Sequence, residues 1–434
     1  AARACAEERP AGVSSNGPAP DPAGAPARPI ATHSGLRDLH LTGADVERTV
    51  GGLVAMAEAA GLTGAIGLAS DGRPGNEELC SQAVEAITAR GRDVVDFGVV
   101  STPGAKLAAH ERGLAGAVIV TASHLPHGWS GLKLVIAPRY FPVDVGALPE
   151  PAERAGTTGE RSEDAEAAAL HADAVVRTVD ADAIRARAPE VGLAGGAGEA
   201  GRLMLELLGC RPGGLTADLT LRLDADGDRL ALADRGGNEL DEETTFALAV
   251  TAVRPRRAVK GADTSRMIED IVAGWAGEVE TVPPGELHLV EAVARTGADL
   301  AGEGNGGVVH PRVALARDGL AAGALVLDLI ARTGASLAEL AAGLPAYARR
   351  RSRFPCEAGD SARAAAEAIA LAYGVDEADP ATGVRLELGE GTWAMVRRSA
   401  TEPVLRITVE GPDRTAVDAL HAELHESIAA AVSS

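Results

Sequence analysis

The first third of the chain shows two kinds of hydrophobic pattern in turn. Apolar residues recur at helical spacing over residues 44–60 and 77–90, and a third helix is expected from about Pro103. Short apolar runs between these segments predict strands at residues 64–70, 93–97 and 115–120. Strands that alternate with helices of about ten to fifteen residues are typical of βαβ units. This region therefore predicts a largely parallel sheet.

Two further blocks continue the alternation. Residues 217–223 form an alternating strand that leads into an acidic loop, and residues 230–233 begin the next apolar strand. Residues 259–265 open a third block, in which residues 318–331 predict a largely buried helix. Both blocks are expected to be α/β.

The last block has a different order of elements. A helix is expected at residues 361–372, then three successive strands at 384–388, 392–397 and 404–410, then a closing helix after Asp413. Strands that follow one another without intervening helices indicate an α+β domain.

The chain has 434 residues, too many for a single hydrophobic core. We predict an α/β protein with three α/β domains of mixed, largely parallel sheets and a C-terminal α+β domain. The expected divisions are 1–30, 31–160, 165–254, 255–346 and 347–434. The first of these is expected to be a disordered leader, because it is rich in Ala, Pro, Gly and Ser and has no hydrophobic segment of the signal-peptide kind.

The charge and the cysteines narrow the possible partners. A formal net charge of −21 argues against nucleic acid, because phosphate binding needs a basic surface. One local basic pocket can still bind a small anionic sugar or nucleotide. The four cysteines are far apart and form no CxxC pair, which indicates reduced thiols. The sequence has no apolar run of about 18 residues, so we expect no membrane span. We further expect a cytoplasmic protein that is a monomer or homodimer and acts on a small molecule.

Ser123 follows the apolar run 115–120, in a loop that also carries His124 and Lys133. In open α/β sheets, ligands bind outside the carboxyl ends of the strands, so Ser123 lies where a nucleophile would be presented. Taken alone, the pattern is more often that of an ordinary Ser-Pro turn.

Asp224, Asp226 and Asp228 alternate on a tight turn after the strand 217–223. Three carboxylates this close repel one another unless a cation neutralises them, and hard oxygen ligands suit Mg²⁺. A solvated acidic turn or a calcium loop is the alternative, although an EF-hand needs a longer loop and flanking helices. The adjoining Arg229 is expected to bind phosphate or phosphoserine, or else to form a surface ion pair.

Arg397, Ser399, Thr401 and Arg406 supply guanidinium and hydroxyl groups around one turn. Arginine binds phosphate as a bidentate fork, and turn amides form a nest for the anion. These arginines are alternatively ordinary surface residues between two strands.

Glu303 and Asn305 lie in a loop with four glycines, residues 302–307. Such a loop allows close backbone approach to a ligand, and the pair can hydrogen-bond to vicinal sugar hydroxyls. A flexible linker is the alternative.

Together, these loops resemble the signatures of the α-D-phosphohexomutases, the superfamily that includes phosphoglucomutase/phosphomannomutase and phosphoglucosamine mutase. Residues 121–124 with Gly131 and Lys133 resemble its active-serine motif. Residues 34–37 resemble the family's N-terminal motif that supplies a catalytic arginine. Its metal-binding, sugar-recognition and phosphate-binding loops resemble residues 224–229, 302–307 and 397–403, respectively. The motifs occur in the family's order from about residue 31 onward.

The resemblance implies four domains around a central cleft and a phosphohexomutase that interconverts hexose 1-phosphate and hexose 6-phosphate. The sugar would be glucose or mannose, or else glucosamine. Ser123 would be carried as a phosphoserine, and a hexose 1,6-bisphosphate would be both intermediate and activator. Lys133 and Arg37 are the implied acid/base groups; we favour Lys133, because an arginine base would need unusual deprotonation. His124 is expected to orient the transferred phosphoryl group.

The resemblance also assigns binding residues. Mg²⁺ would be held by Ser123, Asp224, Asp226 and Asp228. The substrate would be bound by Glu303, Asn305, Arg397, Ser399, Thr401, Arg406 and Arg229.

Several positions depart from the family pattern, namely Leu125, Ser130, Asp38, Ser70, Arg398 and Ala400, and the segment between Gly209 and Asp218 is short. They motivate a second interpretation, a specialised sugar-phosphate mutase of a biosynthetic pathway. A third is a non-catalytic sugar-phosphate-binding descendant, against which the retained aspartates argue. A magnesium-dependent phosphatase with an Asp nucleophile fits poorly, because its DxD motif would come early in the chain.

Overall fold

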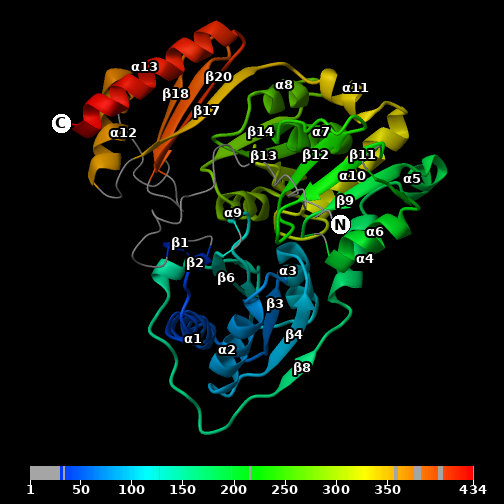
Figure 1. Ribbon diagram of the computed structural model, residues 1–434, viewed down its shortest axis with the longest axis vertical. Helices are drawn as coiled ribbons and strands as arrows, with labels where there is room; N and C mark the ends of the chain where they lie inside the picture. Colours follow the sequence, from blue (N-terminus) through cyan, green and yellow to red (C-terminus); the bar gives the residue numbers. More distant parts are fainter. Residues whose placement is uncertain are drawn as a thin grey trace, which may run out of the picture.

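The computed structural model describes residues 30–32, 35–126, 128–196, 198–214, 217–355, 360–375, 383–398 and 404–433. These residues form four β-sheets with helices packed against them (Figure 1). The first three sheets contain parallel pairs and the fourth is antiparallel throughout. The α/β fold class predicted from the sequence is confirmed.

The first sheet has the strand order β1-β2-β6-β5-β3-β4-β8, with β7 paired to β6. Its strands are β1 (Ile30–Thr32), β2 (Gly35–Asp38), β3 (Ile66–Ser70), β4 (Val94–Val99), β5 (Gly116–Val120), β6 (Ser130–Ile136), β7 (Phe141–Pro142) and β8 (Arg161–Glu163). Its helices are α1 (Gly43–Ala59), α2 (Asn76–Thr88), α3 (Thr102–Glu111) and the short 3₁₀ helix η2 (Val145–Ala147). The central strands β5, β3 and β4 are parallel, whereas β6 runs antiparallel to β5 and to β2.

Helix α1 shows how the sequence sets these elements. Thr42 accepts a hydrogen bond from the backbone N–H of Asp45, whose carboxylate accepts one from the backbone N–H of Thr42, so a capping box begins the helix. Val46, Val50 and Leu53 are fully buried on one face. The helix predicted at 44–60 is confirmed to within one residue at each end.

The second sheet has the order β10-β9-β11-β12, and the third has the order β14-β13-β15-β16. The strands are β9 (Glu190–Ala194), β10 (Arg211–Pro212), β11 (Leu219–Leu223), β12 (Leu230–Asp234), β13 (Arg257–Gly261), β14 (Glu278–Val282), β15 (Leu300–Gly302) and β16 (Val308–Val309). The helices are α4 (Ala167–Val176), α5 (Ala181–Arg187), α6 (Gly198–Leu207), α7 (Glu243–Val253), α8 (Met267–Ala273), α9 (Glu286–Thr296), α10 (Gly319–Thr333) and α11 (Leu337–Ala342).

One continuous hydrophobic cluster joins these two sheets. Helix α10 lies within it, and its side chains are buried without a break from its first residue to Ile330. Asp318 begins α10 by accepting hydrogen bonds from Leu320 N and Ala321 N, and Gly334 ends it in the left-handed conformation. The buried helix predicted at 318–331 is thereby confirmed.

The fourth sheet has the order β17-β20-β19-β18 and is covered on one face by two helices (Figure 1). Its elements are β17 (Ala348–Pro355), α12 (Asp360–Ala372), β18 (Val384–Glu387), β19 (Trp393–Arg398), β20 (Val404–Gly411) and α13 (Arg414–Ser433). The predicted helix, three strands and closing helix are all present, and β17 is a further strand that was not predicted. Among the helices in the described ranges, none combines the length and the apolar character needed to cross a bilayer.

Candidate active site

Ser123 lies three residues beyond the end of the fully buried strand β5 and is itself buried. Its φ of 55° is in the left-handed region, which a non-glycine residue adopts only when the surroundings enforce it. The backbone N–H of Ser123 donates to Thr121 Oγ1 at 2.8 Å, and its Oγ lies 3.4 Å from Asp224 Oδ2. The serine loop therefore meets the acidic loop, as the sequence predicted.

Arg73, which was not among the predicted site residues, holds the loop of Ser123 in place. Its guanidinium donates to the carbonyl oxygens of Ser123 and Leu125, and it pairs with Asp71 at 3.0 Å. Asp71 in turn accepts from Thr121 Oγ1 at 2.7 Å. The strained Ser123 backbone is therefore held from the neighbouring loop after β3.

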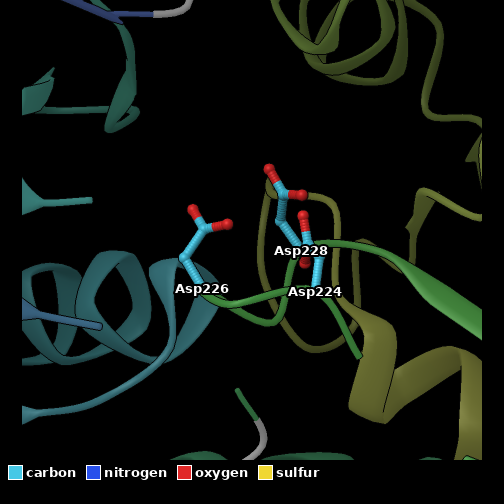
Figure 2. A group of neighbouring side chains, drawn as sticks. All are labelled: Asp224, Asp226 and Asp228. Carbon is cyan, nitrogen blue, oxygen red and sulfur yellow. The ribbon is translucent and has the colours of Figure 1, made fainter. Parts of the chain in front are cut away.

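The three aspartates project from the loop between β11 and β12 (Figure 2). All three are buried, and one oxygen from each lies within 4.8 Å of the others. Burial and the charges of Asp228 and Asp226 raise the pKa of Asp224 well above its usual value. Burial acts on Asp228 in the same direction, but the cations Arg317 and Lys133 outweigh it and hold the pKa of Asp228 well below its usual value.

Two carboxylate oxygens of this cluster are available as ligands for a hard divalent cation. Within the described part of the chain, Asp226 Oδ1 and Asp228 Oδ1 are buried and accept no hydrogen bond, although Arg229 Nε lies 3.7 Å from Asp228 Oδ1. Buried carboxylate oxygens are normally satisfied, and magnesium binds such oxygens together with phosphate and water. The aspartate cluster can therefore hold a metal ion.

Lys133 and Arg37 both lie beside the aspartates, on β6 and β2. Lys133 Nζ is 2.5 Å from Asp226 Oδ2 and 2.8 Å from Asp228 Oδ2. Burial would lower the pKa of Lys133, but these two carboxylates outweigh it and raise that pKa. Burial lowers the pKa of Arg37 to about 10, against the opposing effect of the same aspartates. The raised pKa keeps Lys133 protonated. Lys133 would therefore also need unusual deprotonation to act as a base, and the reason for preferring it to Arg37 no longer applies.

Arg317 is a site residue that the sequence analysis missed. It is buried, and its two terminal nitrogens reach different loops: Nη2 is 2.7 Å from Asp228 Oδ2 and Nη1 is 2.8 Å from Glu303 Oε2. One guanidinium thus joins the acidic loop to the glycine-rich loop.

A cavity beside the aspartates brings together residues from four of the predicted loops. The predicted residues that line it are His124, Arg229, Asn305, Arg397 and Arg406. The charge of Arg229, together with burial, lowers the pKa of the His124 imidazole well below its usual value. His124 is therefore neutral, and in the described ranges its buried Nδ1 has no hydrogen-bond partner.

Three arginines form a row across the C-terminal sheet at this cavity. Arg406 on β20 is the register partner of both Arg397 on β19 and Arg353 on β17, and all three line the cavity. Arg397 also pairs with Asp263 at 2.9 Å. Arg353 was missed, although the alternation of arginines at 349, 351 and 353 places all three on one face of a strand. The row gives the cavity a wall suited to an anion.

Glu303 is placed differently from Asn305. It is buried, its Oε1 accepts from Gly285 N at 2.8 Å, and it does not line the cavity. Asn305 lines the cavity and its Nδ2 lies 3.4 Å from Glu303 Oε2. Ser399 and Thr401, predicted to bind phosphate, lie outside the described residues.

Three family models match the chain. They describe phosphoglucomutase/phosphomannomutase α/β/α domain I at residues 32–139, α/β/α domain III at 242–347 and the C-terminal domain at 353–427. The matched segments together cover more than half of the chain, and the serine loop, the glycine-rich loop and the arginine row lie within them.

Relatives and a solved structure agree with these models. A probable phosphoglucosamine mutase of Methanopyrus kandleri is 27% identical over 398 residues, covering 80% of this chain and 86% of that protein. A phosphoglucomutase/phosphomannomutase of Thermococcus kodakarensis is 29% identical over 391 residues, with coverages of 78% and 84%. The crystal structure of a phosphoglucomutase/phosphomannomutase family protein from Burkholderia thailandensis has the same fold, with a TM-score of 0.75 at 22% identity over 93% of this chain and 97% of that chain. The chain therefore belongs to the phosphoglucomutase/phosphomannomutase family, the mutases of the α-D-phosphohexomutase superfamily.

Proposed function

We propose that this mutase interconverts hexose 1-phosphate and hexose 6-phosphate, with Ser123 as the phosphoryl carrier. The observation that carries the proposal is the position of Ser123: a strained, buried serine whose Oγ lies 3.4 Å from Asp224, one of three clustered, buried aspartates. Phosphoryl transfer depends mainly on positioning and on stabilisation of charge, and this serine loop is fixed by Arg73.

Asp224, Asp226 and Asp228 would hold Mg²⁺ together with an oxygen from the group carried by Ser123. When bound, the ion supplies charge stabilisation as phosphoryl oxygens gain negative charge. The chain's own cations contribute in the same region, since Arg37 and Arg229 lie close enough to shift the pKa of His124.

In the first transfer, the Ser123 Oγ–P bond breaks and a bond forms between that phosphorus and a sugar hydroxyl oxygen. The hydroxyl proton passes to whichever of Lys133 and Arg37, the two basic groups beside the cluster, is present in its deprotonated form. The product is a hexose 1,6-bisphosphate, which turns over within the cavity. The second transfer returns the other phosphoryl group to Ser123, and the proton goes back to the sugar oxygen that is released.

The arginines of the cavity wall would hold the bisphosphate in either of the two orientations that the two transfers require. Arg353, Arg397 and Arg406 would hold the phosphate that does not react, and Ser399 and Thr401 would complete its site. His124, being neutral, would donate a hydrogen bond to the transferred group without adding charge. A free hexose 1,6-bisphosphate would activate the enzyme by loading an unphosphorylated Ser123.

For the sugar, we propose that the glycine-rich loop recognises the 3- and 4-hydroxyls through Asn305, with Glu303 behind it. Glucose, mannose and glucosamine share the configuration at these two carbons and differ at C2. This chemistry does not discriminate among the three, and the two relatives described above carry names for different sugars. We therefore expect turnover of all three 1-phosphates.

The test compares the wild type with Ser123→Ala on the 1-phosphates of glucose, mannose and glucosamine, each with catalytic 1,6-bisphosphate. Wild type should turn over the sugars and carry a phosphoserine detectable by mass after incubation with bisphosphate. Ser123→Ala should lose at least about 1,000-fold in kcat, roughly 4 kcal/mol of transition-state stabilisation. Ser162→Ala, at the far edge strand β8, is the matched control and should keep wild-type rates.

Substantial activity of Ser123→Ala would exclude the phosphoserine mechanism. A wild type that takes up phosphate but turns over none of the three sugars would favour a specialised mutase acting on another sugar phosphate. A wild type that binds hexose phosphate without phosphorylation or turnover would be the non-catalytic descendant.

A further inference from the structure

A Ser-His-Asp cluster lies next to the loop of Asp224, Asp226 and Asp228, here called the aspartate loop. The cluster does not line the cavity described above. His171 on α4 is completely buried; its Nδ1 lies 3.2 Å from Ser101 Oγ and its Nε2 lies 2.7 Å from Asp318 Oδ2. A neutral imidazole with its hydrogen on Nε2 satisfies both partners, donating to Asp318 and accepting from the Ser101 hydroxyl. The cluster joins residues from the first, second and third blocks of the chain.

The arrangement resembles a hydrolytic triad but has no room for a substrate. Ser101 Oγ accepts a hydrogen bond from Gly104 N at 3.2 Å, as the N-cap of α3. The cavity beside Ser101 measures about 10 Å³, which is about the space of a single water. A nucleophilic role for Ser101 is therefore ruled out by access.

The imidazole instead connects the starts of two helices, because Asp318 is the N-cap of α10. Each start touches the aspartate loop directly. Thr102, the first residue of α3, donates from N to Asp226 O at 2.8 Å and from Oγ1 to Asp226 Oδ2 at 2.5 Å. Gly319, the first residue of α10, donates from N to Gly227 O at 3.0 Å.

Arg317 adds a side-chain contact from the same end of α10, reaching Asp228 Oδ2 at 2.7 Å. The fit around the loop is also tight, because a Cβ on Gly227 would come within 2.9 Å of Ser101 Cβ. The aspartate loop is thus held between the first residues of α3 and α10, and the hydrogen bonds of His171 to Ser101 and Asp318 set the distance between these two helix N-termini.

We infer that His171 is a positioning residue that sets the metal-binding geometry of the aspartate loop through Ser101 and Asp318. The inference rests on the metal site of the proposed function. Hydrogen-bond partners that orient ligands from behind typically change metal affinity by about 10- to 100-fold when they are removed. Loss of the imidazole bonds should therefore weaken Mg²⁺ binding in protein that remains folded.

The experiment measures Mg²⁺ binding by titration calorimetry on the full chain, with near-UV circular dichroism to establish folding. His171→Phe should raise the Mg²⁺ dissociation constant about tenfold. His421→Phe is the matched control: His421 is also buried and hydrogen-bonded, to Ser352 in the C-terminal domain, and its replacement should leave the constant within about twofold. Asp226→Asn should abolish binding and so identify the site.

A folded His171→Phe protein with wild-type Mg²⁺ affinity would overturn the inference. If that variant does not fold, Ser101→Gly removes the same contact while preserving most of the N-cap, and an unchanged constant there would overturn it equally. Absence of sugar turnover in a wild type whose Mg²⁺ binding depends on Asp226 and His171 would refute the proposed function alone. Full turnover with no effect of His171→Phe would refute this inference alone.

Discussion

Arg317 satisfies two anionic groups that come from different loops. Its planar guanidinium spans Asp228 and Glu303 with one nitrogen each, at 2.7 and 2.8 Å. Both carboxylates are buried, so each needs a charged partner to remain ionised at low cost. The arginine consequently fixes the distance between the loop of Asp228 and the glycine-rich loop of Glu303.

Arg317→Lys tests whether the fork or only the charge is needed. Lysine keeps the positive charge but presents a single nitrogen, which cannot bridge the two carboxylates in the same way. Losing one charged hydrogen bond costs about 1.5–3 kcal/mol, so kcat/KM should fall about 10- to 100-fold. Arg312→Lys, an exposed arginine on the same segment, should have wild-type kcat/KM. Equal kcat/KM for Arg317→Lys and wild type would mean that charge alone suffices.

The glycine-rich loop between β15 and β16 packs against the first turn of α7. Glu243 is fully buried there, accepting from Arg351 Nη2 at 2.6 Å and from Ser265 N at 3.0 Å. Arg351 also donates to the carbonyl oxygen of Gly304. A residue of the C-terminal sheet therefore contacts both the loop and the carboxylate that supports it.

Gly304→Ala should damage this contact. An added Cβ would lie 1.7 Å from Glu243 Oε1, and the carboxylate cannot withdraw without leaving Arg351. Overpacking of this kind costs about 1–3 kcal/mol of unfolding free energy, measurable by urea titration. Gly156→Ala is the control, since no atom lies within 4 Å of the Cβ position there. Equal midpoints for the two variants would show that the loop shifts freely.

The elements of the fold were more predictable than the partners of the site. Helices such as α1 and α10 carry their caps and apolar faces within a few residues, so a local pattern defines them. Ser123 and Asp224 could be singled out for the same reason, since each lies within three residues of the end of a predicted strand. Arg317 could not, because it meets Asp228 from 89 positions away, and hydrophobic periodicity contains no information on such contacts.

At the scale of the molecule, several charged groups connect the C-terminal sheet to the rest of the protein. Arg351 pairs with Glu243, Arg397 pairs with Asp263, and Glu410 accepts from the backbone of Arg266 at 2.8 Å. Polar interfaces between domains favour relative motion. The arginine row on this sheet would therefore move with it, which suits a site that must admit a sugar phosphate and then exclude water.

The free energy of unfolding of the whole molecule should depend on pH through His310, which follows β16. The side chain is buried, its Nδ1 accepts from Arg312 N at 3.3 Å, and burial together with the Arg312 charge lowers its pKa to about 4 from about 6.5. Between these values the unfolded chain binds a proton that the folded protein does not, so the free energy of unfolding falls as pH falls. The loss should reach about 2–3 kcal/mol by pH 4.5.

Urea titrations at pH 7.5, 5.5 and 4.5 measure this loss, and His310→Asn should reduce it because asparagine keeps an acceptor without a titrating group. The variant can be less stable than wild type at pH 7.5, but its unfolding free energy should decline less on acidification. His40→Asn, which replaces an exposed histidine, should decline as the wild type does. Parallel declines for wild type and His310→Asn would show that His310 is protonated in the folded protein as readily as in the unfolded chain.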